Sequence, residues 1–164
     1  MTTITAEHVR ELFHYDPDTG VITRIVSRSG AKAGSVAGAL HQSGYINIKI
    51  YRRTYKAHRI AWLYMYGEWP QQQLDHINGN RADNRICNLR SATANENSRN
   101  RKTHRNNTSG YKGVTWYARA RKWQASICVN GKKKCIGYFK CPQAAHEAYC
   151  SASVMLHGEF GRTS

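Results

Sequence analysis

The first half of the chain alternates between short helical and short extended patterns of apolar residues. Residues 6–14 place their apolar side chains at helical spacing, whereas 21–26 and 45–50 show strand patterns, the second with strict alternation. A returning strand is expected at 54–57. The apolar segment 58–67 predicts a helix that ends at its glycine.

A polar stretch rich in asparagine follows at residues 74–97. Asn78-Gly79 predicts a tight turn, because both residue types tolerate positive φ. Thr93 and Glu96 have the spacing of a capping box, which predicts a helix that begins directly after the threonine. The expected unit is therefore a strand, a loop, a second strand and a helix.

The last part of the chain changes to three extended segments, at residues 113–117, 122–129 and 132–139, with Asn130-Gly131 as the turn between the last two. Pro142 opens a helix, since proline is favoured in the first turn. These elements predict a three-stranded antiparallel sheet packed on one helix. The chain as a whole is expected to be an α+β protein.

The chain is strongly basic. Its 164 residues carry a formal net charge of +15 and a pI near 9.9, and no acidic residue occurs between positions 99 and 140. This balance favours a polyanionic partner, because cations neutralise phosphates and release their counterions. A well-solvated basic surface is the alternative, and charge alone does not separate DNA from RNA.

Two basic segments lie outside the predicted helices and strands. Residues 27–38, which include Arg28 and Lys32, form either a loop that touches a phosphate backbone or a plain surface loop. Residues 101–109 are expected to be a polar basic linker that orders along DNA on binding.

Cysteine spacing and hydropathy limit the class of protein further. The five cysteines form no C-x-x-C pair, so we expect neither a zinc site nor a disulfide framework. The N-terminus has no basic segment followed by an apolar run, and no apolar stretch approaches about 18 residues. We therefore expect a soluble cytoplasmic protein without a signal peptide or a membrane span.

The polar stretch 74–97 carries residue types that suit phosphodiester hydrolysis. Asp75 and Asn97 offer hard oxygen ligands for Mg²⁺, which keeps several waters and binds substrate phosphates. An imidazole such as that of His76 can take a proton from the attacking water, because its ordinary pKa of about 6.5 lies near working pH. An isolated Asp-His pair is common and Asn-rich loops are often only turns, but here all these features occur together.

Asp75-His76, Asn84, Asn88-Leu89 and Glu96-Asn97 occur in this order along the stretch. On these residues the chain resembles the HNH (ββα-metal) endonuclease family, in the branch that ends with Asn instead of a third His. The resemblance makes His76 the general base, and Asp75 and Asn97 the ligands of one divalent metal, Mg²⁺ or Mn²⁺. By the same resemblance Asn88 ties down the loop and orients His76, and Asn84 braces the loop.

The segment before this motif starts with His-Arg-Ile-Ala at position 58 and ends with Gly-Glu-Trp-Pro at position 70. It resembles the region that precedes the motif in phage-type homing nucleases. We interpret His58 as a residue that packs or bonds locally and not as a third catalytic residue.

The C-terminal part carries four motifs: Gly-Tyr-Lys-Gly-Val at 110–114, Trp123-x-Ala125-x-Ile127, Ile136-Gly137-x-Phe139 and Ala144-Ala145-x-x-Ala148-Tyr149. With these motifs, residues 110–164 resemble the plant ethylene-response-factor (APETALA-type) DNA-binding domain. The resemblance implies that the exposed face of the sheet contacts duplex DNA. The expected DNA-binding residues are cations of this sheet and of the segment before it: Arg99, Arg101, Lys102, Arg105, Lys112, Arg119, Arg121 and Lys133.

These observations predict four parts: an N-terminal region at 1–44, an HNH catalytic module at 45–100, a basic linker at 101–109 and an APETALA-type domain at 110–164. The favoured function is a metal-dependent homing-type endonuclease of phage origin that cuts double-stranded DNA. A monomer would nick one strand and a dimer would cut both, and the sequence leaves this choice open. The alternatives are a non-catalytic sequence-specific DNA-binding protein with a relict HNH fold, and an RNA-binding protein.

Overall fold

The computed structural model describes residues 4–28, 30–100, 103, 106–161 and 163. It divides into two compact units, Met1–Thr93 and Ala94–Ser164, each of which is described by itself. None of the helices in the described part of the chain has the length and apolarity needed to cross a membrane.

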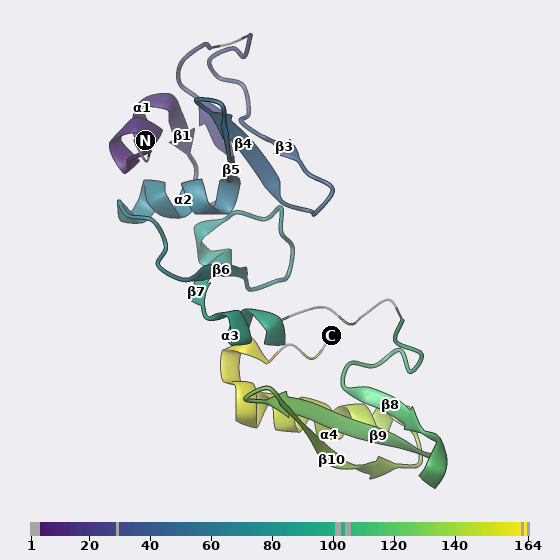
Figure 1. The fold of residues 1–164 in the computed structure, drawn as a ribbon. Coiled ribbons are helices and arrows are strands. Elements are labelled where there is room, and N and C mark those ends of the chain that lie inside the picture. Colours follow the sequence, from purple (N-terminus) through teal and green to yellow (C-terminus); the bar gives the residue numbers. More distant parts are fainter. Residues whose placement is uncertain (1–3, 29, 101–102, 104–105, 162, 164) are drawn as a thin grey trace. The chain divides into compact units, whose positions relative to one another are not determined.

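In its described residues, the first unit contains two short α-helices and three small antiparallel sheets (Figure 1). The sheets pair β1 with β2, β3 with β4 and β5, and β6 with β7. The elements in chain order are α1 (Ala6–Leu12), β1 (Phe13–Tyr15), β2 (Ile22–Arg24), β3 (Ala39–Leu40), β4 (Ile46–Ile50), β5 (Arg53–Lys56), α2 (Ala57–Tyr66), β6 (Gln73–His76), the 3₁₀ turn η1 (Ile86–Asn88) and β7 (Leu89–Ala92).

Local sequence signals explain the ends of both helices. The side chain of Thr5 accepts a hydrogen bond from the His8 backbone N–H and so caps α1. Helix α2 stops at Gly67, which adopts the left-handed conformation with φ 79°. Strand β1 was not predicted, because Phe13 continues the helical spacing of the apolar residues before it.

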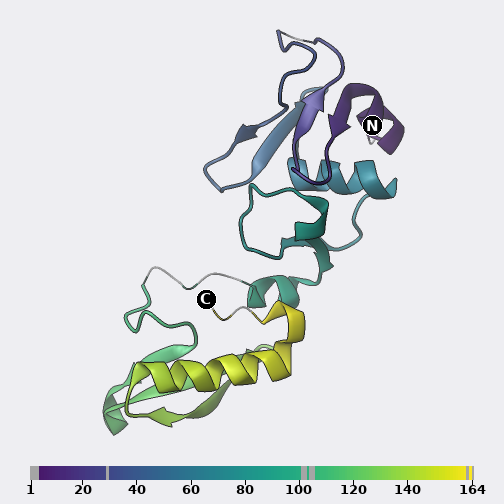
Figure 2. The ribbon, with the colours of Figure 1, turned by 180° about the vertical axis from the view of Figure 1, so that it is seen from behind.

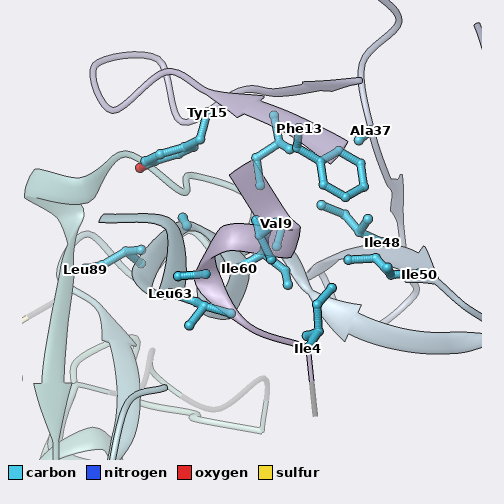
Figure 3. Close-up of a cluster of buried hydrophobic side chains, with 14 residues drawn as sticks. Ile4, Val9, Phe13, Tyr15, Ala37, Ile48, Ile50, Ile60, Leu63 and Leu89 are labelled. Carbon is cyan, nitrogen blue, oxygen red and sulfur yellow. The ribbon is translucent and has the colours of Figure 1, made fainter. Parts of the chain in front are cut away.

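The core of the first unit contains side chains from both of the predicted parts 1–44 and 45–100. Val9 of α1 packs with Ile48 of β4 and with Ile60 and Leu63 of α2, and Leu89 of β7 belongs to the same buried cluster (Figure 3). Burying an aliphatic side chain of this size stabilises the fold by roughly 1.5–3 kcal/mol. One core therefore holds β7 against α2 and α1.

The second unit is a three-stranded antiparallel sheet with the order β10-β9-β8, and α4 lies along one of its faces (Figure 2). Ala145 and Tyr149 of α4 are buried, and Gly113 leaves the space that the Tyr149 ring occupies. The elements are α3 (Ala94–Arg99), β8 (Val114–Tyr117), η2 (Ala118–Ala120), β9 (Lys122–Val129), β10 (Lys132–Phe139), α4 (Pro142–His157) and η3 (Gly158–Phe160).

The predicted fold class is confirmed. Strand, loop, strand and helix follow one another from Gln73 to Arg99, and a three-stranded antiparallel sheet packed on one helix follows them. The helix after Thr93 begins at Ala94, as the capping box predicts. The division of the chain into four parts stays a prediction.

Candidate functional site

The β6–β7 hairpin carries the Asp-His pair. Asp75 pairs with Arg90 across the ladder and His76 pairs with Leu89. Successive strand residues point to opposite faces of a sheet, yet both side chains are buried, with 5% of Asp75 and 4% of His76 exposed. Burial of two polar groups without partners would be costly, so their contacts decide what this site can do.

Asp75 forms an ion pair with its cross-strand neighbour. Arg90 Nε and Nη2 both donate to Asp75 Oδ2, at 3.0 and 2.9 Å. The Asp75 side chain is 6% exposed and the Arg90 side chain 14% exposed. This double contact fixes the orientation of the buried carboxylate.

His76 lies in a cluster of aromatic rings. The His58 ring meets it edge-on, with 4.9 Å between centroids and an interplanar angle of 85°. Tyr45 contacts both imidazoles, at 5.1 Å from His58 and 5.9 Å from His76. The Tyr45 ring in turn lies under two cations, Lys56 Nζ at 4.2 Å and the Arg81 guanidinium carbon at 5.0 Å.

Asn84 provides a polar contact of the His76 ring. The distance between His76 Nε2 and Asn84 Oδ1 is 3.5 Å. An amide oxygen only accepts, so a hydrogen bond at this contact has Nε2 as its donor, and in that tautomer the lone pair of a neutral His76 is on Nδ1. Burial lowers the pKa of His76, and the contacts with Asn84 and Asp75 oppose this shift in part. His76 is therefore a neutral imidazole at pH 7, able to accept a proton.

His58 is buried and neutral as well. Its burial lowers its pKa to about 3, with a further contribution from His76. Its Nδ1 has no hydrogen-bond partner within the described part of the chain. Local packing was the interpretation from the sequence, but the ring contact with His76 was not anticipated. No local pattern indicates it, because it joins the start of α2 to the end of β6.

The loop between β6 and β7 is held by its own side chains. Asn88 Oδ1 accepts from the Asn78 backbone N–H at 3.0 Å, and Asn88 Nδ2 donates to the Asp83 carbonyl at 2.8 Å. The Asp83 carboxylate pairs with Arg85 at 2.6 Å, which lowers the pKa of Asp83 to about 2. Asn88 thus bonds across the loop, whereas the Asn84 side chain contacts the His76 ring. The orienting role of Asn88 stays a prediction.

Residues near the N-terminus support this loop from outside. The Tyr15 hydroxyl donates to the Asn84 carbonyl at 2.8 Å, and the Ile86 N–H donates to the Pro17 carbonyl at 3.1 Å. Gly20, with φ 73°, lies so close that a Cβ there would stand 2.5 Å from the Arg85 nitrogen. The turn after β1 therefore holds the backbone that carries Asn84.

Asn97 lies on α3, in the second unit, where it is half-buried. Its place beside Asp75 in a metal site stays a prediction. Among the described residues no group of three or more His, Cys, Asp or Glu side chains could hold a metal ion.

The predicted DNA-binding residues fall into three sets. Arg119, Arg121 and Lys133 are exposed, the first two around η2 and the third on β10. Lys112 Nζ donates to the Arg99 carbonyl at 2.9 Å, which ties the start of the sheet to α3. The remaining predicted contacts, Arg101, Lys102 and Arg105, lie outside the described residues.

Comparison with known proteins bears on the region around this site. The family model described as HNH endonuclease matches residues 55–99, which include β6, the loop and β7. Protein 3.8 of Escherichia phage T7 is 38% identical over 118 residues, which make up 70% of this chain and 97% of that protein. The chain belongs to the HNH endonuclease family.

Two further similarities were found for this HNH family member. The AP2-like ethylene-responsive transcription factor TOE2 of Arabidopsis thaliana is 37% identical over 60 residues, or 37% of this chain but only 12% of that protein. A solved structure titled "DNA binding and cleavage by the HNH homing endonuclease I-HmuI" covers 89% of this chain and 85% of its own. It is 19% identical with a TM-score of 0.41, which is too low to support a functional assignment.

Proposed function

We propose that this HNH family member is a homing-type endonuclease that hydrolyses phosphodiester bonds in double-stranded DNA. The observation that carries the proposal is the neutral, buried imidazole of His76 next to the fixed carboxylate of Asp75, on one hairpin within the matched HNH region. Family membership supplies the class of reaction, and the two side chains supply a proton acceptor and a hard oxygen donor.

His76 acts as the general base in this proposal. The nitrogen that carries its lone pair, Nδ1 in the arrangement described above, accepts a proton from the water that attacks phosphorus. Because burial lowers the pKa of His76, the imidazole remains a base below the ordinary value of 6.5. The T-shaped contact with the His58 ring and the contact with the Asn84 amide keep the imidazole in one orientation.

The donor set fits a divalent cation of the Mg²⁺ or Mn²⁺ type. Asp75 presents a carboxylate and Asn97 an amide oxygen, and these hard ligands suit an ion that keeps several waters. The two hydrogen bonds that Arg90 donates to Asp75 Oδ2 hold the carboxylate in a single orientation. When bound, such an ion neutralises charge on the phosphate and on the leaving oxygen.

The C-terminal unit positions the enzyme on DNA in this proposal. The resemblance to APETALA-type domains, the similarity to an AP2-like factor over 60 residues and the exposed cations Arg119, Arg121 and Lys133 support this role. Arg99, Lys112, Arg101, Lys102 and Arg105 are proposed as further phosphate contacts. The similarity to a phage protein fits an enzyme that acts in the cytoplasm of a host cell.

A plasmid assay tests the proposed reaction. Purified protein with supercoiled plasmid and Mg²⁺ or Mn²⁺ should yield open-circle DNA if a monomer nicks, or linear DNA if a dimer cuts both strands, and EDTA should stop the reaction. Binding of the same plasmid without any cut, with either metal and across varied sequences, would instead indicate a DNA-binding protein with a relict HNH fold. A preference for structured RNA over duplex DNA in a gel shift would contradict the proposed substrate.

A further inference from the structure

A basic cleft lies in the first unit on elements that the proposed catalytic site does not use. It has a volume of about 700 Å³ and lies between the β1–β2 ladder, the loop after β2 and the turn between β4 and β5. Its cations are Arg24, Arg28, Lys49 and Arg52, and its lining within the described residues contains no carboxylate. Leu12, Phe13 and Ile50 give it an apolar floor.

The turn at one wall of this cleft has an unusual backbone for its residues. Tyr51 and Arg52 both adopt positive φ, 47° and 67°, where two-residue hairpin turns usually carry Asn or Gly. Large side chains that are kept in such a conformation are frequent at functional sites. Here both residues line the cleft, and both are exposed.

Two of the arginines in the cleft are held in place. The Arg28 guanidinium carbon lies 4.5 Å from the centroid of the exposed Tyr51 ring. Arg24 Nη1 donates to the Val36 carbonyl at 2.7 Å. Guanidinium groups fixed by such contacts lose less conformational entropy when an anion binds.

We propose that this cleft binds the phosphate backbone of the DNA duplex, away from the phosphodiester bond that is cut. The inference rests on the proposed endonuclease function. Four cations without a carboxylate attract a polyanion, and guanidinium and ammonium groups are the usual phosphate contacts of proteins on DNA.

The length of strand β4 gives the approximate distance between the cleft and the proposed general base, His76. The ring of Tyr45, just before β4, contacts His76, and Tyr51 follows directly after β4. Six residues of extended chain span about 20 Å. Phosphates of one strand are about 3.4 Å apart along the duplex axis. In a complex in which β4 runs along that axis, the cleft contacts the backbone about six nucleotides from the cut.

The salt dependence of DNA binding tests the cleft without requiring cleavage. Arg28→Gln, Lys49→Gln and Arg52→Gln should each reduce the slope of log K against log salt by about 0.9. Lys32→Gln is the matched control, because this exposed residue of the same loop does not line the cleft, and it should keep the wild-type slope. Unchanged slopes in all three cleft variants, with the fold verified by circular dichroism, would overturn the inference.

A footprint then locates the contact. The His76→Ala variant, bound to DNA that the wild-type enzyme cuts, should protect the DNA backbone about six nucleotides from the cut position. When Arg28→Gln and Arg52→Gln are added to this variant, that protection should disappear and the rest of the footprint should stay unchanged. Protection that persists would contradict the cleft's role while leaving the nuclease proposal intact. If the wild type never cuts DNA, the salt slopes still test whether the cleft binds the DNA backbone. Loss of binding to RNA and not to duplex DNA in these variants would overturn the assignment to DNA.

Discussion

Two imidazoles in contact define the site at the scale of single residues. His58 and His76 are both buried, and burial lowers the pKa of each. A proton on either ring would place a charge in a poorly solvated site, and a charge on one ring would raise the cost of protonating the other. The pair therefore links the proposed base to the acid stability of the fold.

The stability of the protein should fall between pH 7 and pH 5 because of His58. Its pKa is lowered from 6.5 to about 3 on folding. The unfolded chain thus takes up the proton first as pH falls below 6.5, and the linked loss of stability grows down to the folded-state pKa. At pH 5 this loss is roughly 2 kcal/mol. Urea unfolding of His58→Phe should show a smaller difference between the two pH values.

The control for this experiment is His14→Phe, which removes an exposed histidine of β1. It should keep the wild-type difference between pH 7 and pH 5. An equal pH dependence in wild type and His58→Phe would show that His58 does not titrate as a buried group.

The Asp75–Arg90 pair allows a second prediction at this scale. Arg90→Leu leaves a buried carboxylate without its ion-pair partner, which should reduce the free energy of unfolding by about 3–5 kcal/mol. Adding Asp75→Asn should recover part of the loss, since it removes the buried charge. A double-mutant cycle by chemical denaturation measures the coupling, and additive losses would contradict a direct ion pair.

At the scale of elements, the loop between β6 and β7 depends on a turn far away in sequence. Tyr15, Pro17 and Gly20 contact the loop backbone at Asn84, Arg85 and Ile86. The Asn84 side chain reaches His76 from that backbone. Displacement of the β1–β2 turn should therefore move a contact of the proposed base without changing any residue of the motif.

Gly20→Ala should disturb the loop and slow DNA nicking. The new Cβ would stand 2.5 Å from Arg85 N and 2.6 Å from Asn84 C, both backbone atoms that cannot rotate away. Gly34→Ala is the matched control, because Gly34 has a similar φ of 79° but nothing within 4 Å of its Cβ position. Thermal unfolding and a nicking assay should show a larger loss for Gly20→Ala. Equal losses in the two variants would mean that backbone strain at positive φ causes the effect, and not the close approach of Gly20 to the loop.

The elements were predictable where local rules decide them. The extended segments expected at 122–129 and 132–139, with the Asn130-Gly131 turn between them, match the bounds of β9 and β10. The capping signal at Thr93 likewise located the start of α3.

The contacts around the site were less predictable. The adjacency of Asp75 and His76 is visible in the sequence, whereas the bond of Tyr15 to Asn84 spans 69 positions and the ring contact of His58 joins two separate elements. Such contacts depend on tertiary packing, which no local pattern encodes.

At the scale of the whole molecule, the net charge of +15 is distributed over both units. Arg119, Arg121 and Lys133 lie exposed in the second unit, and the basic cleft lies in the first. In the proposed function, cations of both units hold the duplex, while the β6–β7 hairpin supplies the general base and one metal ligand, and α3 supplies the other ligand, Asn97.

Cations of the C-terminal sheet should affect affinity and not the chemical step. Arg119→Gln, Arg121→Gln and Lys133→Gln should weaken binding to duplex DNA, while the cleavage rate of fully bound DNA stays near the wild-type value. Lys140→Gln, which changes an exposed lysine beyond β10, is the control and should weaken binding less. Unchanged affinity in the three sheet variants would argue against this face as the DNA contact.

The most direct test of the central claim is the single-turnover rate of DNA nicking by His76→Ala, measured with saturating protein beside the wild type. If His76 is the general base, the rate should fall by about 10²- to 10⁴-fold while DNA affinity stays close to wild type and the variant remains folded at the assay temperature. A variant that binds DNA normally and still nicks at nearly the wild-type rate would contradict the account.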